Sequence, residues 1–130
     1  MQEGRTLILS VDRDDDIGFK ANIESPVVGR DACLHAANAL GLADPEDSDI
    51  NAIFQAVSLY DELKNRGEDV EVAIIAGNHM HMIEGDRKIA ASLSEVVART
   101  GVSNCIVVTD GAEDEFVLPG EKDGRTFPAP

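Results

Sequence analysis

The sequence predicts an α/β domain with a short parallel sheet and helices on both faces of that sheet. At 130 residues, the chain is long enough for one domain with its own apolar core. The composition is 43% apolar but only 4% aromatic, so the core must consist mainly of Val, Ile, Leu and Ala, as in a buried parallel sheet. Short apolar runs alternate with helical patterns, which is typical of parallel strands joined by helices.

Three continuous apolar runs predict buried strands. They occupy residues 6–11 (TLILSV), 70–76 (VEVAIIA) and 105–109 (CIVVT). We expect the first strand at the centre, in the order 2-1-3, which gives a three-layer, Rossmann-like arrangement. The first and third strands would then flank a switch point, where the carboxyl ends of parallel strands commonly bind ligands.

Three segments with apolar residues at helical spacing predict the helices. These segments are about residues 30–40, 49–66 and 86–100. A glycine follows each segment and is expected to end the helix, at Gly41, Gly67 and Gly101.

Two stretches lack a regular pattern. The connection 12–29 is long for so small a domain, and the segment 120–130 has no periodicity. We therefore expect a domain at residues 1–119 followed by an irregular tail at residues 120–130. Cys33 and Cys105 fall on apolar stretches without metal-ligand spacing, so we expect both to be reduced core residues.

Acidic residues follow the first predicted strand directly. The sequence VDRDDD places four carboxylates close together, at Asp12, Asp14, Asp15 and Asp16. Carboxylates held a few ångströms apart repel one another, and Mg²⁺ or Ca²⁺ relieves that repulsion. The alternative is a solvated acidic loop on an acidic protein. An EF-hand is excluded, because Ile17 and Ile23 stand where its loop needs Gly and Glu.

A second acidic cluster, TDGAEDE, follows the third predicted strand. It contains Asp110, Glu113, Asp114 and Glu115. If the chain turns into a helix there, Asp110 and Asp114 project from one face. With the strand order 2-1-3, both clusters open into one crevice. We expect Asp12, Asp14 and Asp110 to bind Mg²⁺ there, with Asp15 and Asp114 in support.

The loop after the second strand is the candidate anion contact. Glycines and an asparagine before a helix can offer backbone N–H groups to a phosphate, and nearby arginines can pair with it. The candidate ligand-binding residues are Arg13, Gly77, Asn78, Asp86, Arg87 and Gly111. His79 and His81 alternate in the same loop and suit a transition metal, but two histidines without a third ligand are more often an exposed loop.

The charge limits the classes of partner. The net charge is -14, from 25 acidic and 11 basic residues, which argues against binding nucleic acid or anionic lipid by charge. The sequence shows no GxGxxG or Walker loop, and no local Ser-His-Asp or Cys-His arrangement. It has no signal-peptide pattern and no run of about 20 apolar residues, so we expect a soluble, cytoplasmic chain.

Short motifs resemble two superfamilies. The pairs Asp12 with Asp14 and Asp110 with Asp114 resemble the first and last motifs of haloacid-dehalogenase-like phosphatases. The acids after the first strand, together with Asp110, resemble a response-regulator receiver domain. The Ser or Thr and the Lys that both superfamilies need have no match, so each resemblance covers only short motifs.

Longer strings resemble one archaeal family, called domain of unknown function 373. They are LILSVDRDDDIGFKANIESPVVGRDA, LADPEDSDINAIFQAVSLYDELK, VEVAIIAGN, DRKIA and VVTDGAEDEFVLP, which run in order to about Pro119. Members are predicted membrane proteins with a soluble N-terminal region before several transmembrane helices. The resemblance implies that this chain is that soluble part, at the cytoplasmic face of a membrane, with the membrane region of the same full-length protein as its partner.

Two functions follow as hypotheses. The first is a Mg²⁺-assisted site for a phosphate-containing small molecule or nucleotide, whose turnover, and hence status as an enzyme, stays open. The second is a non-enzymatic module that regulates or assembles a membrane protein. A strand at the sheet edge is also able to pair with another copy, which makes a homodimer reasonable.

Overall fold

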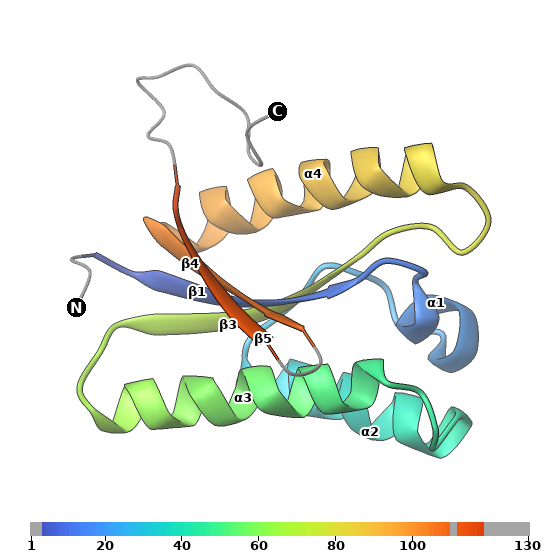
Figure 1. Cartoon of the computed structure of the whole chain (residues 1–130), viewed down its shortest axis with the longest axis horizontal. Coiled ribbons are helices and arrows are strands. Elements are labelled where there is room, and N and C mark those ends of the chain that lie inside the picture. Colours follow the sequence, from blue (N-terminus) through green and yellow to red (C-terminus); the bar gives the residue numbers. More distant parts are fainter. Residues whose placement is uncertain (1–3, 110–111, 119–130) are drawn as a thin grey trace.

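The computed structural model describes residues 4–109 and 112–118, which form a mixed five-stranded sheet with helices packed on it (Figure 1). The α/β class is therefore confirmed. In chain order the elements are β1 (Thr6–Asp12), α1 (Asp16–Ala21), β2 (Val27–Val28), α2 (Arg30–Ala43), α3 (Asp49–Asn65), β3 (Val70–Ala76), α4 (Met82–Thr100), β4 (Asn104–Thr109) and β5 (Ala112–Val117).

The sheet has the strand order β2-β3-β1-β4-β5. β1 pairs in parallel with β3 on one side and with β4 on the other, so that Leu9 lies between Ala73 and Val107. β2 and β5 are antiparallel to their neighbours. Only two residues separate β4 from β5, and so short a connection allows only an antiparallel return. The sheet is therefore mixed and has five strands, unlike the short parallel sheet that the sequence predicted.

Each face of the sheet carries its own apolar layer. Figure 1 shows α4 along one face and α2 with α3 along the other. Ile8 and its neighbours pack under α2 and α3, while Leu7 and Leu9 pack under α4, as the alternation of side chains along β1 requires. Cys33 and Cys105 are buried free thiols within these layers, as predicted, and burial raises the pKa of each to about 12.

The helices begin and end at somewhat different residues from those predicted. α2 continues through Gly41 to Ala43, so Gly41 does not end it. α4 begins at Met82, four residues before the predicted start. Gly101 does end α4, with a φ of 68° that favours glycine. The connection 12–29 is not irregular throughout, because it contains α1 and β2.

Some predictions fall outside the described residues. Asp110, Gly111 and the tail 120–130 are among them. Within residues 4–109 and 112–118, none of the helices combines the length and the apolar character needed to cross a membrane.

Candidate functional site

Asp12 ends β1 and organises the start of α1. Its carboxylate accepts hydrogen bonds from the backbone N–H groups of Asp16 and Ile17, both at 2.9 Å. Asp15 caps the same helix by accepting from the N–H of Gly18 at 3.2 Å. The backbone oxygen of Asp12 accepts from the N–H of Gly77 at 2.8 Å, which joins the end of β1 to the loop after β3. Asp12 therefore fixes α1 against the carboxyl edge of the sheet.

Three carboxyl groups converge beside this helix. Asp12, Asp16 and Asp49 each place one oxygen so that all three oxygens lie within 4.8 Å of one another. Asp12 is only 1% exposed, and the other two are half-buried. Asp16 comes from the first turn of α1 and Asp49 from the first turn of α3. We call these three residues the acidic trio.

The pKa values of all three carboxyl groups of the acidic trio are raised. Burial raises the pKa of Asp12, an effect opposed by its two backbone hydrogen bonds, and burial also raises the pKa of Asp16. Burial, a hydrogen bond with Asp16 and the charge of Asp12 together raise the pKa of Asp49 to about 8. In the absence of a cation, the trio therefore retains a proton at neutral pH.

Lys20, which lies in α1 with Asp16, is engaged by other carboxylates. The Nζ of Lys20 donates to Asp44 at 2.7 Å and to Asp47 at 2.8 Å. Burial would raise the pKa of Asp47, but its hydrogen bonds with Lys20, with the backbone N–H of Asp49 and with Asp16 together outweigh burial and lower that pKa. Lys20 thus joins α1 to the α2–α3 connection by pairing with Asp44 and Asp47. The charge of the acidic trio is then balanced by a proton or by an added cation.

A hollow of about 650 Å³ lies on another side of α1, against the loop after β3. Phe19 and His79 stack at its wall, with ring centroids 3.7 Å apart and planes 12° apart. Lys88 donates to the backbone oxygen of Gly77 at 3.1 Å and lies 3.7 Å from a carboxylate oxygen of Asp15. The remaining lining residues are Gly18, Asn22, Ile23, Glu24, Ser25 and Asn78.

Close backbone packing shapes this hollow. A Cβ at Gly77 would collide with the backbone oxygen of Arg13, and one at Gly85 would come within 2.9 Å of the backbone nitrogen of Asn78. Glycine is therefore required where the loop after β3 passes the loop after β1. The hollow lies between the ends of β1 and β3, and not between the first and third predicted strands. The chain leaves β1 toward α2 and α3 but leaves β3 toward α4, and such a divergence opens a crevice.

The structure separates the predicted metal ligands. Asp12 belongs to the acidic trio, whereas Asp14 is exposed and Asp15 caps α1 and lines the hollow. Asp114 lies in β5, so the helix expected there is a strand, which the tight return from β4 imposes. Asp114 pairs with Val107 of β4, which in turn pairs with Leu9 of β1. Two strand spacings and the three residues from Leu9 to Asp12 therefore place Asp114 about 14 Å from Asp12.

The predicted ligand-binding residues are also divided. Gly77 and Asn78 line the hollow, and the Asn78 side chain accepts from the N–H groups of Met80 and His81. Asp86 instead forms an exposed ion pair with Arg13 at 3.1 Å. Arg87 is exposed, and because α4 begins at Met82 it is not in the first turn of that helix.

The sequence does not reveal Asp16 and Asp49 as partners of Asp12. Asp16 belongs to the acidic run VDRDDD, but its spacing from Asp12 indicates a contact only once a helix is known to begin at Asp16. Asp49 lies in ADPEDSD, a segment that looks like an ordinary helix start. Its approach to Asp12 depends on the packing of α2 and α3 on α1 and β1, which no local pattern reveals.

Comparisons with known proteins agree on one family. A family model described as a domain of unknown function (DUF373) matches residues 5–120. An uncharacterised protein of Archaeoglobus fulgidus is 57% identical over 115 residues, and one of Methanocaldococcus jannaschii is 43% identical over 115 residues. These matches cover 88% and 86% of this chain but 33% and 31% of the relatives, so the chain spans about a third of their length. No solved structure matches the chain significantly. The chain belongs to the family of domains of unknown function designated DUF373.

Proposed function

We propose that this domain binds a divalent cation at the acidic trio, with Mg²⁺ as the first candidate, and a phosphate-containing small molecule in the neighbouring hollow. The observation that carries the proposal is the convergence of Asp12, Asp16 and Asp49 within 4.8 Å. Carboxylate oxygens are the ligands that Mg²⁺ and Ca²⁺ prefer.

The spacing of the trio suits one ion. Three oxygens at most 4.8 Å apart all lie within about 2.8 Å of a common centre, a few tenths of an ångström beyond the Ca²⁺ range of about 2.3 to 2.6 Å. Mg²⁺ binds at about 2.0 to 2.1 Å and requires the side chains to close by less than an ångström. A cation would replace the proton that Asp49 retains at neutral pH, so binding and proton release are coupled.

α1 links the cation to the hollow. Asp16 and Lys20, one turn apart, face the acidic side, whereas Gly18 and Asn22 line the hollow. A cation that holds Asp12 and Asp16 together therefore holds the wall of the hollow in place. The parallel strands β3, β1 and β4, with helices on either side, support a Rossmann-like reading in which the ligand binds at the carboxyl ends.

The lining of the hollow suits a polar ligand with a planar group. Lys88 supplies positive charge, and the buried Ser25 hydroxyl has no hydrogen-bond partner. The Phe19 ring is exposed and offers a face for a base. The carboxylates of Asp15 and Glu24 would repel an anion in the hollow, so a phosphate group would bind there together with a cation. Asp110 and Gly111 lie outside the described residues, and their part in the site stays a prediction.

Calorimetry tests the cation site. We expect Mg²⁺, Mn²⁺ or Ca²⁺ to bind with a dissociation constant below about 1 mM, and the enthalpy to depend on the ionisation enthalpy of the buffer because a proton is released. Asp49→Asn should abolish binding, and Asp14→Asn, a matched change at an exposed neighbour, should preserve it. Binding weaker than millimolar for every cation would end the proposal.

A nucleotide and phosphomonoester screen tests the hollow. We expect the melting temperature to rise further when a phosphate compound is added with the cation than when either is added alone. Lys88→Met should remove the additional rise and leave the cation effect intact. Phosphate release during the screen would make the domain an enzyme, since a carboxylate-bound cation is a common feature of phosphoryl transfer.

The second candidate function is a non-enzymatic cytosolic module that regulates or assembles a membrane protein. The observation that favours it is the length of the relatives, of which this chain covers about a third. The full-length protein should then sediment with membranes and the isolated domain should not. A full-length protein that stays in the soluble fraction would refute this candidate.

A further inference from the structure

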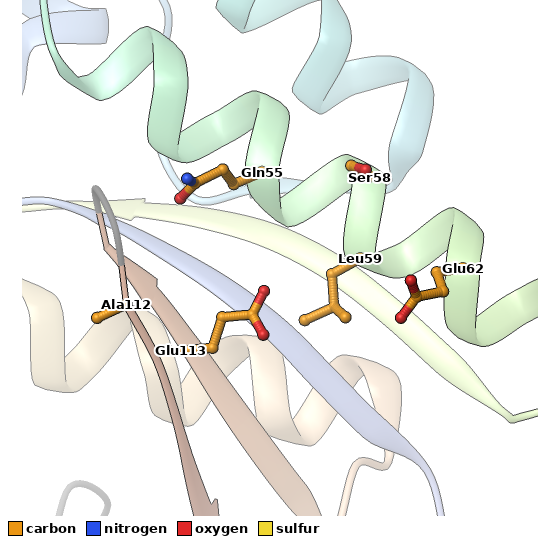
Figure 2. Close-up of a pocket in the computed structure, with 6 residues that line it drawn as sticks. All are labelled: Gln55, Ser58, Leu59, Glu62, Ala112 and Glu113. Atoms are coloured by element: carbon orange, nitrogen blue, oxygen red, sulfur yellow. The ribbon is translucent and has the colours of Figure 1, made fainter.

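A groove runs between α3 and β5, on the sheet face opposite α4 and away from the acidic trio. It consists of two adjoining hollows of about 560 and 270 Å³ that share Leu59, Glu62 and Glu113. Figure 2 shows Gln55, Leu59 and Glu62 extending from α3 and Glu113 extending toward them from β5. The pairing of Glu113 and Glu115 with Val108 and Ile106 of β4 directs both carboxylates to this face.

The groove is acidic and has an apolar floor. Four glutamates line its two hollows, at Glu62, Glu68, Glu113 and Glu115. Arg66 is the basic residue of the lining, and it lies 3.6 Å from Glu62 at the exposed surface. Leu59, Leu63 and Ile106 form the apolar part of the lining.

Two buried oxygens in the smaller hollow have no hydrogen-bond partner. They are the Oγ1 of Thr6, a residue only 3% exposed, and the Oε1 of Glu68. Buried polar atoms normally have a partner, and a carboxylate oxygen accepts only. A ligand with N–H donors would satisfy both, since the Glu68 oxygen requires a donor and the Thr6 hydroxyl can accept from one.

A metal ion does not fit this pattern. Among the described residues, the one group of three carboxylates within 4.8 Å of one another is the acidic trio, so no three glutamates of the groove converge on one ion. Glu113 and Glu115 project from the same strand face about 6.8 Å apart. An alkyl chain of three or four methylene groups separates two ammonium groups by a similar length.

We infer that the groove binds a linear alkyl polyamine. Its ammonium groups pair with the glutamates and donate to Thr6 and Glu68, and its methylene groups lie on Leu59, Leu63 and Ile106. An ammonium has three donors and no acceptor, which suits two buried oxygens that can accept and have no hydrogen-bond partner. The site is independent of the acidic trio and of the hollow beside α1.

Spermidine titration with a charge-matched control tests the inference, because any polycation is attracted to a protein of net charge -14. Glu113→Gln with Glu115→Gln should weaken binding by about tenfold or more. Glu84→Gln with Glu95→Gln makes the same charge change on exposed positions of α4, and should weaken it by less than about twofold. Equal losses in the two variants would mean non-specific attraction and would overturn the inference.

Two further measurements separate a defined site from a diffuse one. Butylamine has one ammonium group and should bind at least about tenfold more weakly than spermidine at equal ionic strength. Thr6→Val removes the unpartnered hydroxyl, so it should leave the free protein at least as stable and yet weaken spermidine binding. Unchanged spermidine affinity in a folded Thr6→Val protein would contradict the placement of an ammonium group at Thr6.

Discussion

Replacing Asp49 with asparagine should stabilise the cation-free protein and destroy its response to cations. Two unit charges 4.8 Å apart repel by about 1 to 3.5 kcal/mol, between the dielectric of water and that of a protein surface. The asparagine would carry no charge, and its amide would still donate to a neighbouring carboxylate as the protonated Asp49 does. At about pH 9, above the pKa of Asp49, the variant should gain about 1 to 3 kcal/mol of unfolding free energy.

Thermal and urea unfolding in chelator measure this difference. For a chain of this length, 1 kcal/mol corresponds to a rise of about 3 to 6 °C in melting temperature. At about pH 6 the gain should shrink, because Asp49 of the wild type is then protonated. Adding Mg²⁺ at ten times its dissociation constant should stabilise the wild type by about 1.4 kcal/mol and leave the variant unchanged. A destabilised variant that still responds fully to Mg²⁺ would refute the reasoning.

Further predictions concern pH and glycine. Because burial raises the pKa of Asp49 to about 8, the native state binds more protons than the unfolded chain between about pH 5 and 8. Unfolding free energy measured in chelator should therefore fall as pH rises through that window, and saturating cation should flatten the fall. Gly41→Ala should raise the unfolding free energy by about 0.5 to 1 kcal/mol, since Gly41 lies inside α2 and a Cβ there meets only Ile50 at 3.8 Å. Gly77→Ala should lower it by about 2 kcal/mol or more, because the added carbon collides with the backbone of Arg13. Equal urea midpoints for the two glycine variants would contradict this packing.

The sequence predicted the strands that are buried and missed those that are exposed. The runs 6–11, 70–76 and 105–109 are apolar because β1, β3 and β4 lie between helices or other strands. All six residues of β5 are exposed, and its sequence AEDEFV carries three acids, so an apolar pattern could not reveal it. An exposed edge strand is held by its backbone hydrogen bonds to one neighbour, which leave no trace in the side chains.

The candidate site was predictable only where it depends on one strand end. Asp12 follows an apolar run, and an acid at the carboxyl end of a parallel strand is a recognisable signal. Asp49 lies 37 positions further along the chain and reaches Asp12 only because α3 packs beside β1. Asp114 was assigned to the same crevice because a helix was expected after β4. β5 instead pairs antiparallel with β4, which places Asp114 away from the crevice.

Anomalous diffraction from a crystal grown with Mn²⁺ would locate a cation at the acidic trio directly. We expect one strong peak about 2.0 to 2.6 Å from oxygens of Asp12, Asp16 and Asp49, and no peak in crystals of Asp49→Asn. Manganese bound at Asp14, Asp15 or the histidines of the loop after β3, with none at the trio, would contradict this expectation.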